Sequence, residues 1–390
     1  MSGKQKRRIF RVLEVNKAYY PHVGGIETLV RQYTRELGAA DGVEVTALVC
    51  RDGRGRTIYS HEDTPERERI IRAGSFGTYF SCPVSLSFIR LFRKLSKNAD
   101  AVHINVPFPL ADLALLLSGY KGRVVVSWHS DVVKQKRLLK LYRPLLLRLL
   151  HRADAIAAAT QGHIDGSEWL SMPEFRKKCV IVPYGIDPEE YLSVERRPVL
   201  TQRLNNKNAA KLFFTGRLVY YKGVGTLLKA MCLTADESYP CELFIAGTGA
   251  MESELKAECS RLGLDKRVHF LGYLSDTELR QAYADCDIFI LPSVERSEAF
   301  GIVQLEAMIY GKPVINTLLP TGVPHVSLNK VTGYTVPPGD FESLAGAIVR
   351  LLHNPELMRE YGSAAAERVQ KEFLEKDVIK RLYRVLRGDS

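Results

Sequence analysis

The sequence lacks the features of a membrane-spanning or secreted protein. Its 390 residues contain no run of eighteen apolar residues, so no segment is long enough to cross a bilayer as a helix. The basic start, MSGKQKRRIFRV, has neither the apolar stretch nor the small-residue cleavage site of a secretory signal peptide. Seven cysteines, an odd number without paired spacing, argue against a disulfide framework and a zinc site. These absences favour a cytoplasmic protein.

Repeats and low-complexity tracts are also missing, which excludes solenoid architectures and disordered arrays. Hydrophobic residues make up 46% and charged residues 25% of the chain, a profile typical of soluble globular proteins. A length of 390 residues exceeds one ordinary core and indicates two domains.

Positive charge is concentrated in the first half of the chain. Residues 1–190 hold 30 Lys/Arg against 20 Asp/Glu, and residues 191–390 hold 25 against 24, so the net charges are +10 and +1. The first half therefore suits an anionic partner, with nucleic acid, an acidic membrane surface and phosphorylated substrates all open on charge alone.

Short apolar runs alternate with helical patterns along the whole chain. Strand-like runs include RIFRVLEV, VEVTALVC, DAVHINV, RVVVSW, KLFFTG, CELFIAG, RVHFLG and DIFILPS. Helical spacing is found at residues 26–37, 223–233, 250–262 and 275–284. The alternation predicts α/β, doubly wound domains with parallel sheets. It restarts after the polar stretch 195–211, where we place the domain boundary, with residues 183–188 as the approach to the hinge. Ligands are expected at the carboxyl ends of the strands.

The stretch FFTGRLVYYKGVG follows a strand and precedes a helix. Arg217 and Lys222 lie beside glycines there, so cations and helix N–H groups could together hold a diphosphate. The alternative is a solvated loop. The nearby Gly247 and Gly249 form only a GxG, which is as typical of a tight turn as of a ligand contact.

The stretch SEAFGIVQLE raises a similar choice. Gly301 permits close backbone approach, a helix is expected to start there, and Glu298 and Glu306 are separated by roughly 8–12 Å on helical rise. This reach matches a molecule in which Glu298 meets a sugar, the N–H groups of residues 300–303 meet phosphate and Glu306 meets a ribose. The alternative is that Ser297 caps the helix, Glu298 favours its positive end and Glu306 is an ordinary polar position.

Two further pairs of polar residues lie next to predicted strands. His129 and Asp131 come directly after RVVVSW, where a polar cluster indicates a site, although a lone histidine is more often structural. Asp131 could orient His129 or contact an acceptor. Asp285 and Asp287 invite a metal interpretation, but they precede the strand IFILPS and we interpret them as helix-end capping residues.

The sequence GRLVYYKG followed by SEAFGIVQLEAMIYGKPVI resembles the family-4 retaining glycosyltransferases of the GT-B fold. YYPHVGGIE, VVVSWHSD and VPYGID occur in the expected order, so the resemblance covers nearly the whole chain. The E-x7-E pair with the R-x4-K loop is its most specific part. Ala299 stands where relatives often carry glycine or proline.

The resemblance implies a role for each matching residue. Arg217 and Lys222 would neutralise a donor diphosphate, and Gly24 and Gly25 would approach the phosphates or the acceptor from the other domain. Glu298 would face the donor sugar and His129 would lie beside it, while Glu306 would bind the ribose. Together with the loop, the implied diphosphate contacts are Arg217, Lys222, Gly24, Gly25, Phe300, Gly301, Ile302 and Val303.

The resemblance also implies two Rossmann-like domains facing across a cleft, with no metal or other cofactor required. We expect an acceptor-side domain at 1–190, a nucleotide-sugar-binding domain at 191–370 and a C-terminal helix at 371–390 packing back on the first. The stretches SEAFGIVQLEAM and PTGVPHVSLN look most like bacterial polysaccharide mannosyltransferases, which favours GDP-mannose as donor and a lipid-linked or oligosaccharide acceptor.

Basic amphipathic patterns at 85–97 and 134–154 suit an anionic membrane surface, or equally a solvated helix face. We therefore expect a cytoplasmic protein, with peripheral attachment to the inner face of the plasma membrane as one option. No nucleic-acid module is recognisable, so nucleic acid is not an expected partner. A UDP-sugar-dependent transferase, a nucleotide-sugar epimerase or hydrolase, a phosphorylase and a non-catalytic sugar-nucleotide-binding protein stay open as alternatives.

Overall fold

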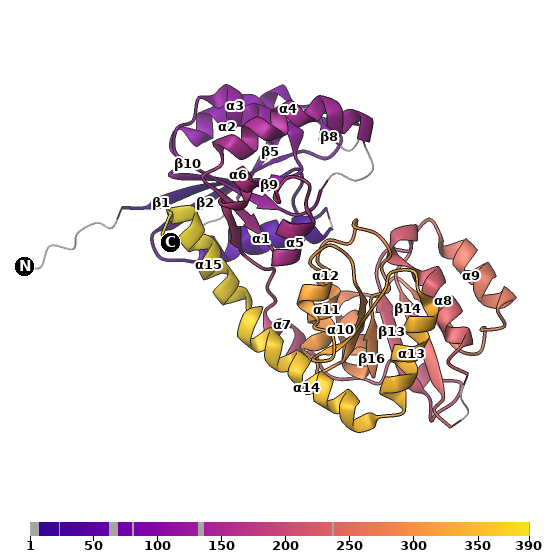
Figure 1. The fold of residues 1–390 in the computed structure, drawn as a ribbon. Coiled ribbons are helices and arrows are strands. Elements are labelled where there is room, and N and C mark those ends of the chain that lie inside the picture. The colour runs from indigo at the N-terminus through magenta and orange to yellow at the C-terminus, as the bar shows by residue number, and fades with distance from the viewer. Residues whose placement is uncertain are drawn as a thin grey trace, which may run out of the picture. The chain divides into compact units, whose positions relative to one another are not determined.

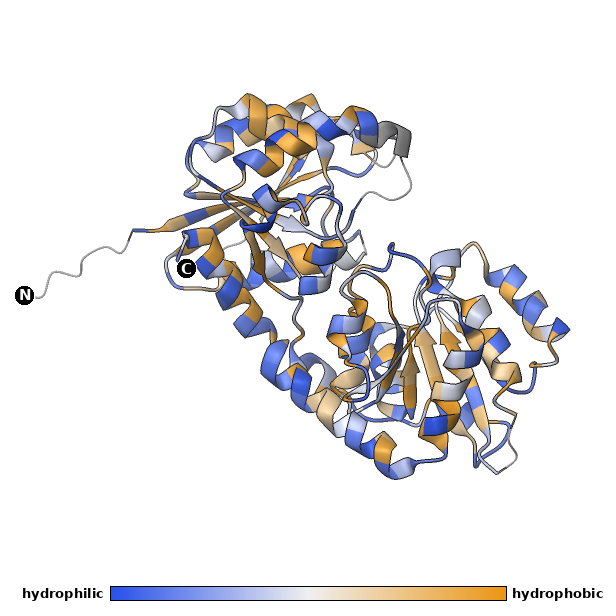
Figure 2. Ribbon diagram, in the orientation of Figure 1, coloured by the Kyte–Doolittle hydropathy of each residue, from blue (hydrophilic) through white to orange (hydrophobic). Residues whose placement is uncertain are grey.

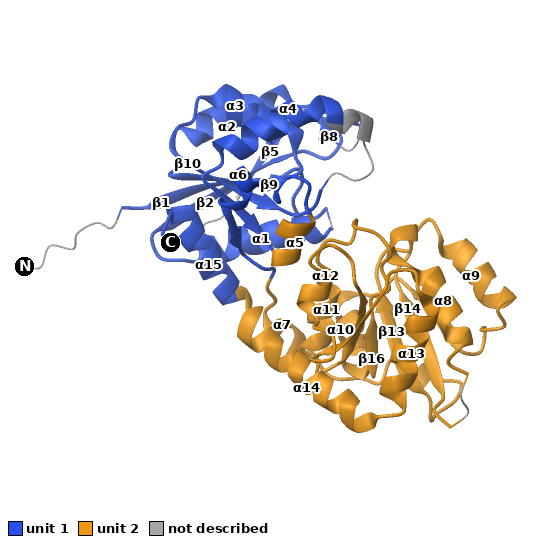
Figure 3. Cartoon of the chain, viewed as in Figure 1, with its two compact units in different colours: residues 1–159, 167–184, 376–390 blue, residues 160–166, 185–375 orange. Residues whose placement is uncertain are grey.

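The computed structural model describes residues 8–22, 24–61, 69–79, 82–131, 136–235 and 238–389, without the side chains of residues 61 and 136–139. Figure 1 labels its helices and strands. The chain divides into two compact units, coloured in Figure 3. Unit 1 consists of residues 1–159, 167–184 and 376–390, and unit 2 consists of residues 160–166 and 185–375. The boundary after Tyr184 therefore lies upstream of the 195–211 stretch chosen from the sequence.

Unit 1 is built on an eight-stranded sheet in the order β12-β11-β10-β9-β1-β2-β5-β4. The strands are β1 Phe10–Val15, β2 Val43–Cys50, β4 Ile58–His61, β5 Arg69–Ala73, β9 Ala101–Val106, β10 Arg123–Trp128, β11 Ala155–Ala158 and β12 Cys179–Ile181. All pairs are parallel except β4 with β5 at the edge. Short antiparallel pairs join β3 Arg54–Gly55 to β6 Ser75–Phe76, and β7 Thr78–Tyr79 to β8 Cys82–Pro83.

Helices connect these parallel strands. They are α1 Gly25–Gly38, α2 Leu86–Ser96, α3 Pro109–Ser118, α4 Lys136–Arg152 and α6 Pro173–Arg176. The Ser85 side chain caps α2 by accepting the Phe88 N–H. The last helix, α15 Glu375–Arg387, packs on unit 1, where Arg123 Nε donates to the Val385 carbonyl at 2.8 Å and the Tyr383 ring meets Phe10.

Unit 2 has a six-stranded, wholly parallel sheet in the order β15-β14-β13-β16-β17-β18. Its strands are β13 Ala210–Thr215, β14 Cys241–Ala246, β15 Val268–Gly272, β16 Ile288–Ile290, β17 Val314–Thr317 and β18 Gly333–Val336. Its helices are α5 Gln161–Gly166, α7 Pro188–Leu192, η1 Thr201–Arg203, η2 Tyr220–Lys222, α8 Val224–Cys232, α9 Glu252–Arg261, α10 Asp276–Asp285, α11 Val303–Met308, α12 Val323–Val326, α13 Phe341–Leu352 and α14 Pro355–Glu372.

Strand composition accounts for both sheets. Strands covered by helices on both faces are expected to be continuously apolar, and the strands in Figure 2 are predominantly hydrophobic while the helices mix both colours. β14 and β16 are buried along their whole length. The apolar face of α8 packs into the same core, with Leu227 and Leu228 fully buried.

The predicted α/β architecture with parallel, doubly wound sheets is confirmed. The helical spacings at 26–37, 223–233, 250–262 and 275–284 correspond to α1, α8, α9 and α10. The helix expected from Gly301 is shorter and begins later, at Val303. Among the described residues, no helix combines the length and the hydrophobicity needed to cross a bilayer.

Candidate active site

A buried ion pair lies where β13 and β16 end in unit 2. The Lys222 ammonium is 2.5 Å from Glu298 Oε2, and the two side chains are only 12% and 10% exposed. Ser293, just beyond β16, donates its hydroxyl to the same carboxylate oxygen at 3.0 Å. Two predicted site residues that are 76 positions apart in the sequence therefore meet at the carboxyl edge of one sheet.

Glycines allow this close arrangement. Gly223, between η2 and α8, has φ +70°, and a Cβ there would lie 2.0 Å from the Pro292 carbonyl oxygen. The loop carrying Lys222 therefore sits directly on the segment that leads from β16 to Glu298. Gly249 is equally confined, since its Cβ would lie 2.3 Å from the Leu218 carbonyl oxygen. The GxG of residues 247–249 thus serves the packing of two loops against each other.

Arg217 is the second predicted cation of this loop. It follows Gly216 and is exposed, whereas Lys222 is largely buried. Within the described part of the chain, the Arg217 guanidinium takes part in none of the side-chain hydrogen bonds or ion pairs. The loop therefore carries one cation committed to Glu298 and a second that faces solvent.

The loop from Ala299 to Val303 completes this edge. Gly301 has φ +69°, and a Cβ there would lie 2.4 Å from Leu291 Cδ2, so the position requires glycine. Phe300 is buried against the ring of Phe373, at 6.2 Å between centroids. Ile302 is the N-cap of α11, and no side chain caps this helix. The alternative in which Ser297 caps it is therefore wrong.

Glu306 is held by two tyrosines. Its Oε2 accepts from the Tyr283 hydroxyl at 2.6 Å, and its Oε1 accepts from the Tyr191 hydroxyl at 3.1 Å. Burial raises the pKa of the Glu306 carboxyl, while both tyrosine hydroxyls lower it. The position is thus not the ordinary polar one of the alternative interpretation, and its carboxylate is oriented from α7 and α10.

His129 follows β10 in unit 1 and is buried, with 3% exposure. Its Nδ1 is 2.7 Å from the Tyr184 hydroxyl, and its Nε2 is 2.8 Å from Asn105 Oδ1. Both ring nitrogens are therefore engaged by unit 1 itself. His129 is therefore part of a hydrogen-bonded network and is not an isolated histidine.

Asp131 does not orient His129 through any of its identified bonds. Its Oδ1 accepts from Trp128 Nε1 at 2.9 Å and from the Ser167 hydroxyl at 2.7 Å, and its Oδ2 accepts from the Glu168 N–H at 3.2 Å. The carboxylate instead ties the end of β10 to the segment that begins at Ser167.

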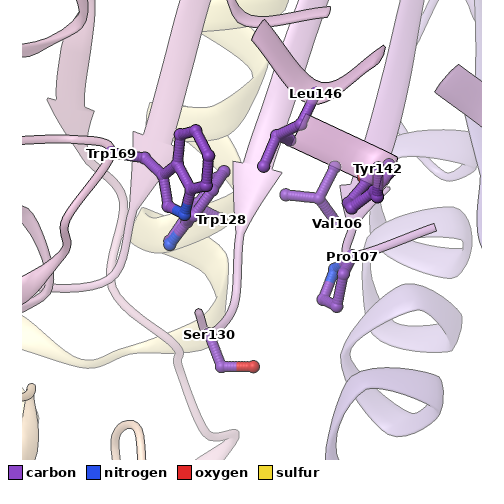
Figure 4. Close-up of a pocket in the computed structure, with 7 residues that line it drawn as sticks. All are labelled: Val106, Pro107, Trp128, Ser130, Tyr142, Leu146 and Trp169. Carbon is purple, nitrogen blue, oxygen red and sulfur yellow. The ribbon is translucent and has the colours of Figure 1, made fainter. Parts of the chain in front are cut away.

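A pocket opens beside this tie, at the carboxyl ends of β9 and β10. Figure 4 shows aromatic and apolar side chains around it, with the two indoles on one side. It is lined by Val106, Pro107, Trp128, Ser130, Tyr142, Leu146 and Trp169.

Gly24 and Gly25 open α1, with Gly24 in an extended conformation at φ −171°. The Glu27 carboxylate folds back over this helix tip, and a Cβ on Gly24 would lie 2.3 Å from its Oε2. A phosphate approaching these glycines would have to displace an acidic side chain, which the sequence pattern did not reveal.

Asp285 and Asp287 have structural partners. Asp285 accepts from the N–H groups of Leu200 and Thr201, so it caps η1 instead of its own helix. Asp287 accepts from the Lys211 N–H and pairs with its ammonium at 3.0 Å. No acidic, histidine or cysteine cluster suited to a metal ion occurs among the residues that the structure describes.

Comparison with known proteins shows to which family the chain belongs. Residues 197–368 match the model "Glycosyl transferases group 1", and residues 23–190 match "Glycosyltransferase Family 4". The chain is 31% identical to the O-antigen chain mannosyltransferase C of Escherichia coli, over 93% of this chain and 94% of that protein. It is 35% identical to the D-rhamnosyltransferase WbpZ of Pseudomonas aeruginosa, over 93% and 92%.

Among solved structures, the sucrose-phosphate synthase of Thermosynechococcus elongatus superimposes with a TM-score of 0.76 at 22% identity, covering 98% of this chain and 100% of that one. This likeness concerns the fold. Together with the sequence relatives, it shows that the chain belongs to the family-4 glycosyltransferases and has the GT-B fold.

Proposed function

We propose that the protein transfers mannose from GDP-mannose, with retention of configuration, to a hydroxyl of a lipid-linked glycan during cell-surface polysaccharide assembly. The observation that carries this proposal is the buried contact of Lys222 with Glu298 at the carboxyl edge of the unit 2 sheet. The names of the two relatives, a mannosyltransferase and a rhamnosyltransferase, support a hexosyl donor of this kind.

The departing diphosphate is the charge that the site must stabilise. Arg217 is exposed and Lys222 is near it in the same loop, so both cations can bind phosphate oxygens by charge-assisted hydrogen bonds. The N–H groups of Phe300, Gly301, Ile302 and Val303 precede or open α11, where helix N–H groups lack intrahelical partners. Fixed donors aimed at developing charge typically contribute 10²- to 10³-fold to a rate. The proposal needs no metal or other cofactor.

The two glutamates are proposed to hold opposite ends of the donor. Each carboxylate oxygen accepts more than one hydrogen bond, so Glu298 can bind sugar hydroxyls while it remains paired with Lys222. Glu306 can likewise bind ribose hydroxyls while Tyr283 and Tyr191 orient it. A donor that bridges these residues would be aligned with its diphosphate beside Lys222.

The acceptor is proposed to bind unit 1 at the pocket of Figure 4. Trp128 and Trp169 line it but are only 4% and 5% exposed, whereas Ser130 is partly exposed and offers a hydroxyl. The pocket lies at the carboxyl ends of β9 and β10, the edge at which open parallel sheets bind ligands. This edge is therefore the proposed place of acceptor binding.

Peripheral binding to the inner face of the plasma membrane is part of the proposal. Exposed leucines gather on the neighbouring helices α2, α3 and α4, with Leu141 80% exposed. Exposed basic side chains accompany them: Arg90, Arg93, Lys94, Lys97, Lys140, Arg143 and Arg148. Residues 134 and 135 and the side chain of Arg137, which belong to the predicted basic pattern, lie outside the described residues. Each basic residue near an anionic surface contributes about 1 kcal/mol.

Flotation with liposomes tests this membrane binding. Vesicles containing anionic lipid should carry the protein upward at low salt, and neutral vesicles should not. Absence of binding to anionic vesicles at every salt concentration would refute it.

The donor is tested by thermal shift with GDP-, UDP- and ADP-sugars. Of these sugars, GDP-mannose should raise the melting temperature of the wild type most. The same sugar should raise the melting temperature of Lys222→Ala much less. A larger shift with a UDP-sugar would replace the donor assignment by a UDP-dependent one. NMR of the product's anomeric signal then decides retention against inversion.

Other activities have separate signatures. Rapid full turnover of donor without acceptor would favour a hydrolase or epimerase, and absorbance of a lysine-bound pyridoxal group would favour a phosphorylase. Donor binding without transfer to any acceptor would indicate a sugar-nucleotide-binding protein.

A further inference from the structure

A row of buried polar side chains crosses the centre of the unit 1 sheet. Glu14 on β1 pairs in register with His103 on β9, and Asn105 on β9 pairs with Ser127 on β10. His103 and Asn105, and likewise Ser127 and His129, are two positions apart and thus project to the same face. Glu14 and His103 are fully buried and Asn105 is 2% exposed.

Hydrogen bonds join this row into one network. Glu14 Oε2 is 2.6 Å from His103 Nδ1, whose ring partner Nε2 is 2.7 Å from the Ser127 hydroxyl. Glu14 Oε1 accepts from Asn105 Nδ2 at 2.6 Å, and the same amide group donates to the Val15 carbonyl at 3.1 Å. Asn105 Oδ1 then faces His129 Nε2 at 2.8 Å.

The chemistry of these groups leaves one orientation for the Asn105 amide. A carboxylate oxygen and a carbonyl oxygen only accept, so the atom that faces Glu14 and Val15 must be the NH₂ group. The opposite orientation would place the single amide oxygen against two acceptor oxygens in a buried site, which is costly. Asn105 Oδ1 is therefore turned to His129, and His129 Nε2 must carry a proton.

The second ring nitrogen of His129 follows from this. With Nε2 protonated, the neutral ring has a lone pair on Nδ1, which accepts the Tyr184 hydroxyl at 2.7 Å. Burial raises the pKa of Tyr184, so this hydroxyl keeps its proton and can donate it to Nδ1. Tyr184 is also the residue after which the chain leaves unit 1.

We propose that Glu14 and Asn105 are positioning residues that hold His129 as the Nε2–H tautomer. His129 is then a fixed neutral group whose two nitrogens are occupied within unit 1, and it does not shuttle a proton in the reaction. The statement that His129 does not transfer a proton rests on the proposed function. The assignment of the Nε2–H tautomer does not depend on that function. Glu14, 115 positions upstream, thus acts on His129 through a single amide.

Long-range ¹H–¹⁵N NMR of histidine-labelled protein, with His129→Gln for assignment, reads the tautomer directly. Wild-type His129 should show the Nε2–H pattern at neutral pH. In Glu14→Gln, the new amide can donate to His103 Nδ1, so His103 should move its proton to Nε2 while His129 stays unchanged. Glu14→Leu removes the shorter of the two hydrogen bonds that orient the Asn105 amide and should give a mixed His129 pattern. Ser127→Ala removes a side chain that hydrogen-bonds to His103 and not to the Asn105 amide, so it is the matched control and should leave His129 unchanged.

Transfer kinetics give the second readout. Glu14→Leu should lower kcat about tenfold, equivalent to one buried hydrogen bond of roughly 1.4 kcal/mol, with donor KM within about twofold. Glu14→Gln should keep kcat within about threefold of the wild type, as expected when residue 14 acts by orienting the Asn105 amide and not by its charge.

A wild-type His129 that is Nδ1–H or doubly protonated would overturn the proposal. A folded Glu14→Leu with unchanged His129 signals and unchanged kcat would also overturn it. If Glu14→Leu does not fold, the wild type and Glu14→Gln spectra decide. Should no nucleotide sugar bind while the NMR patterns hold, the proposed function fails and the tautomer assignment stands.

Discussion

Replacing Lys222 by alanine separates its two contributions, to unit 2 stability and to transfer. The ammonium and the Glu298 carboxylate are nearly buried, so removal of one charge leaves the other with the Ser293 hydroxyl as its remaining identified partner. Breaking a buried pair in this way typically costs 3–5 kcal/mol. Since about a tenth of each side chain still reaches water, we expect a loss at the lower end, about 3 kcal/mol.

The effect on transfer has a different origin. Lys222 is proposed to neutralise the departing diphosphate, so its loss should lower kcat by about 10²- to 10³-fold, the range for removing one fixed electrostatic donor. When Glu298→Gln is added to Lys222→Met, the double variant should regain part of the lost stability, because the buried carboxylate without its cation is replaced by a neutral amide. It should not restore transfer, because the cation is still missing.

The assay must report unit 2 alone. Both tryptophans, Trp128 and Trp169, lie in unit 1, so their fluorescence follows unit 1 during urea unfolding. Far-UV circular dichroism reports both units, and a phase seen by dichroism but not by fluorescence belongs to unit 2. Lys371→Ala removes the cation of the exposed helical pair with Glu367 and serves as the matched control without measurable loss.

A double-mutant cycle of Lys222→Met and Glu298→Gln completes the test. Coupling of less than about 0.5 kcal/mol would show that the contact contributes no more than an exposed pair. Wild-type kcat in Lys222→Ala would contradict the proposed role of Lys222 in transfer, even if unit 2 were destabilised as expected.

Three further predictions concern pH and backbone conformation. Burial, reinforced by His325, lowers the pKa of His163 to about 4, so the histidine binds a proton at higher pH in the unfolded state than in the folded state. The free energy of unfolding of unit 2 should therefore fall by about 3 kcal/mol as the pH falls from about 6.5 to 4, and His163→Phe should flatten this slope in urea titrations. Burial raises the pKa of Asp112 to about 7 although the Tyr142 hydroxyl lowers it, so its contribution to the stability of unit 1 is complete below about pH 4 and is lost as the pH rises to 7. In urea unfolding followed by tryptophan fluorescence, Asp112→Asn should abolish this pH dependence, and an unchanged dependence would refute the prediction. In Gly223→Ala, the residue would keep φ +70° and its Cβ would lie 2.0 Å from the Pro292 carbonyl oxygen, so the free energy of unfolding from the dichroism transition should fall by more than about 1 kcal/mol. Gly346→Ala should change it very little, because a Cβ there meets nothing within 4 Å.

Local patterns predicted the elements of unit 2 better than their ends. The apolar run KLFFTG and the following helical spacing correspond to β13 and α8, because a buried parallel strand and an amphipathic helix have different periods. The helix after Gly301 starts one residue later than expected, at Val303, since Gly301 adopts positive φ and Ile302 takes the N-cap position. The edge pair of β4 and β5 was not predicted, because its short polar sequence IYSH has no clear period.

Partners of the site residues depend on strand order, which a local pattern does not contain. Glu298 and Lys222 were found because two motifs named them, yet Tyr191 reaches Glu306 from 115 positions away without any signature of its own. The row in unit 1 had a signal that was missed. The buried parts of FRVLEV and RVVVSW each hold one polar residue, Glu14 and Ser127, and AVHINV holds two, His103 and Asn105, whereas buried parallel strands are typically apolar. Such residues must find partners inside the protein. Once β1, β9 and β10 are adjacent, register alone brings Glu14 to His103 and Asn105 to Ser127. A polar residue in a strand predicted to be buried is therefore evidence for strand neighbours that carry its partners, and here those partners lead to His129.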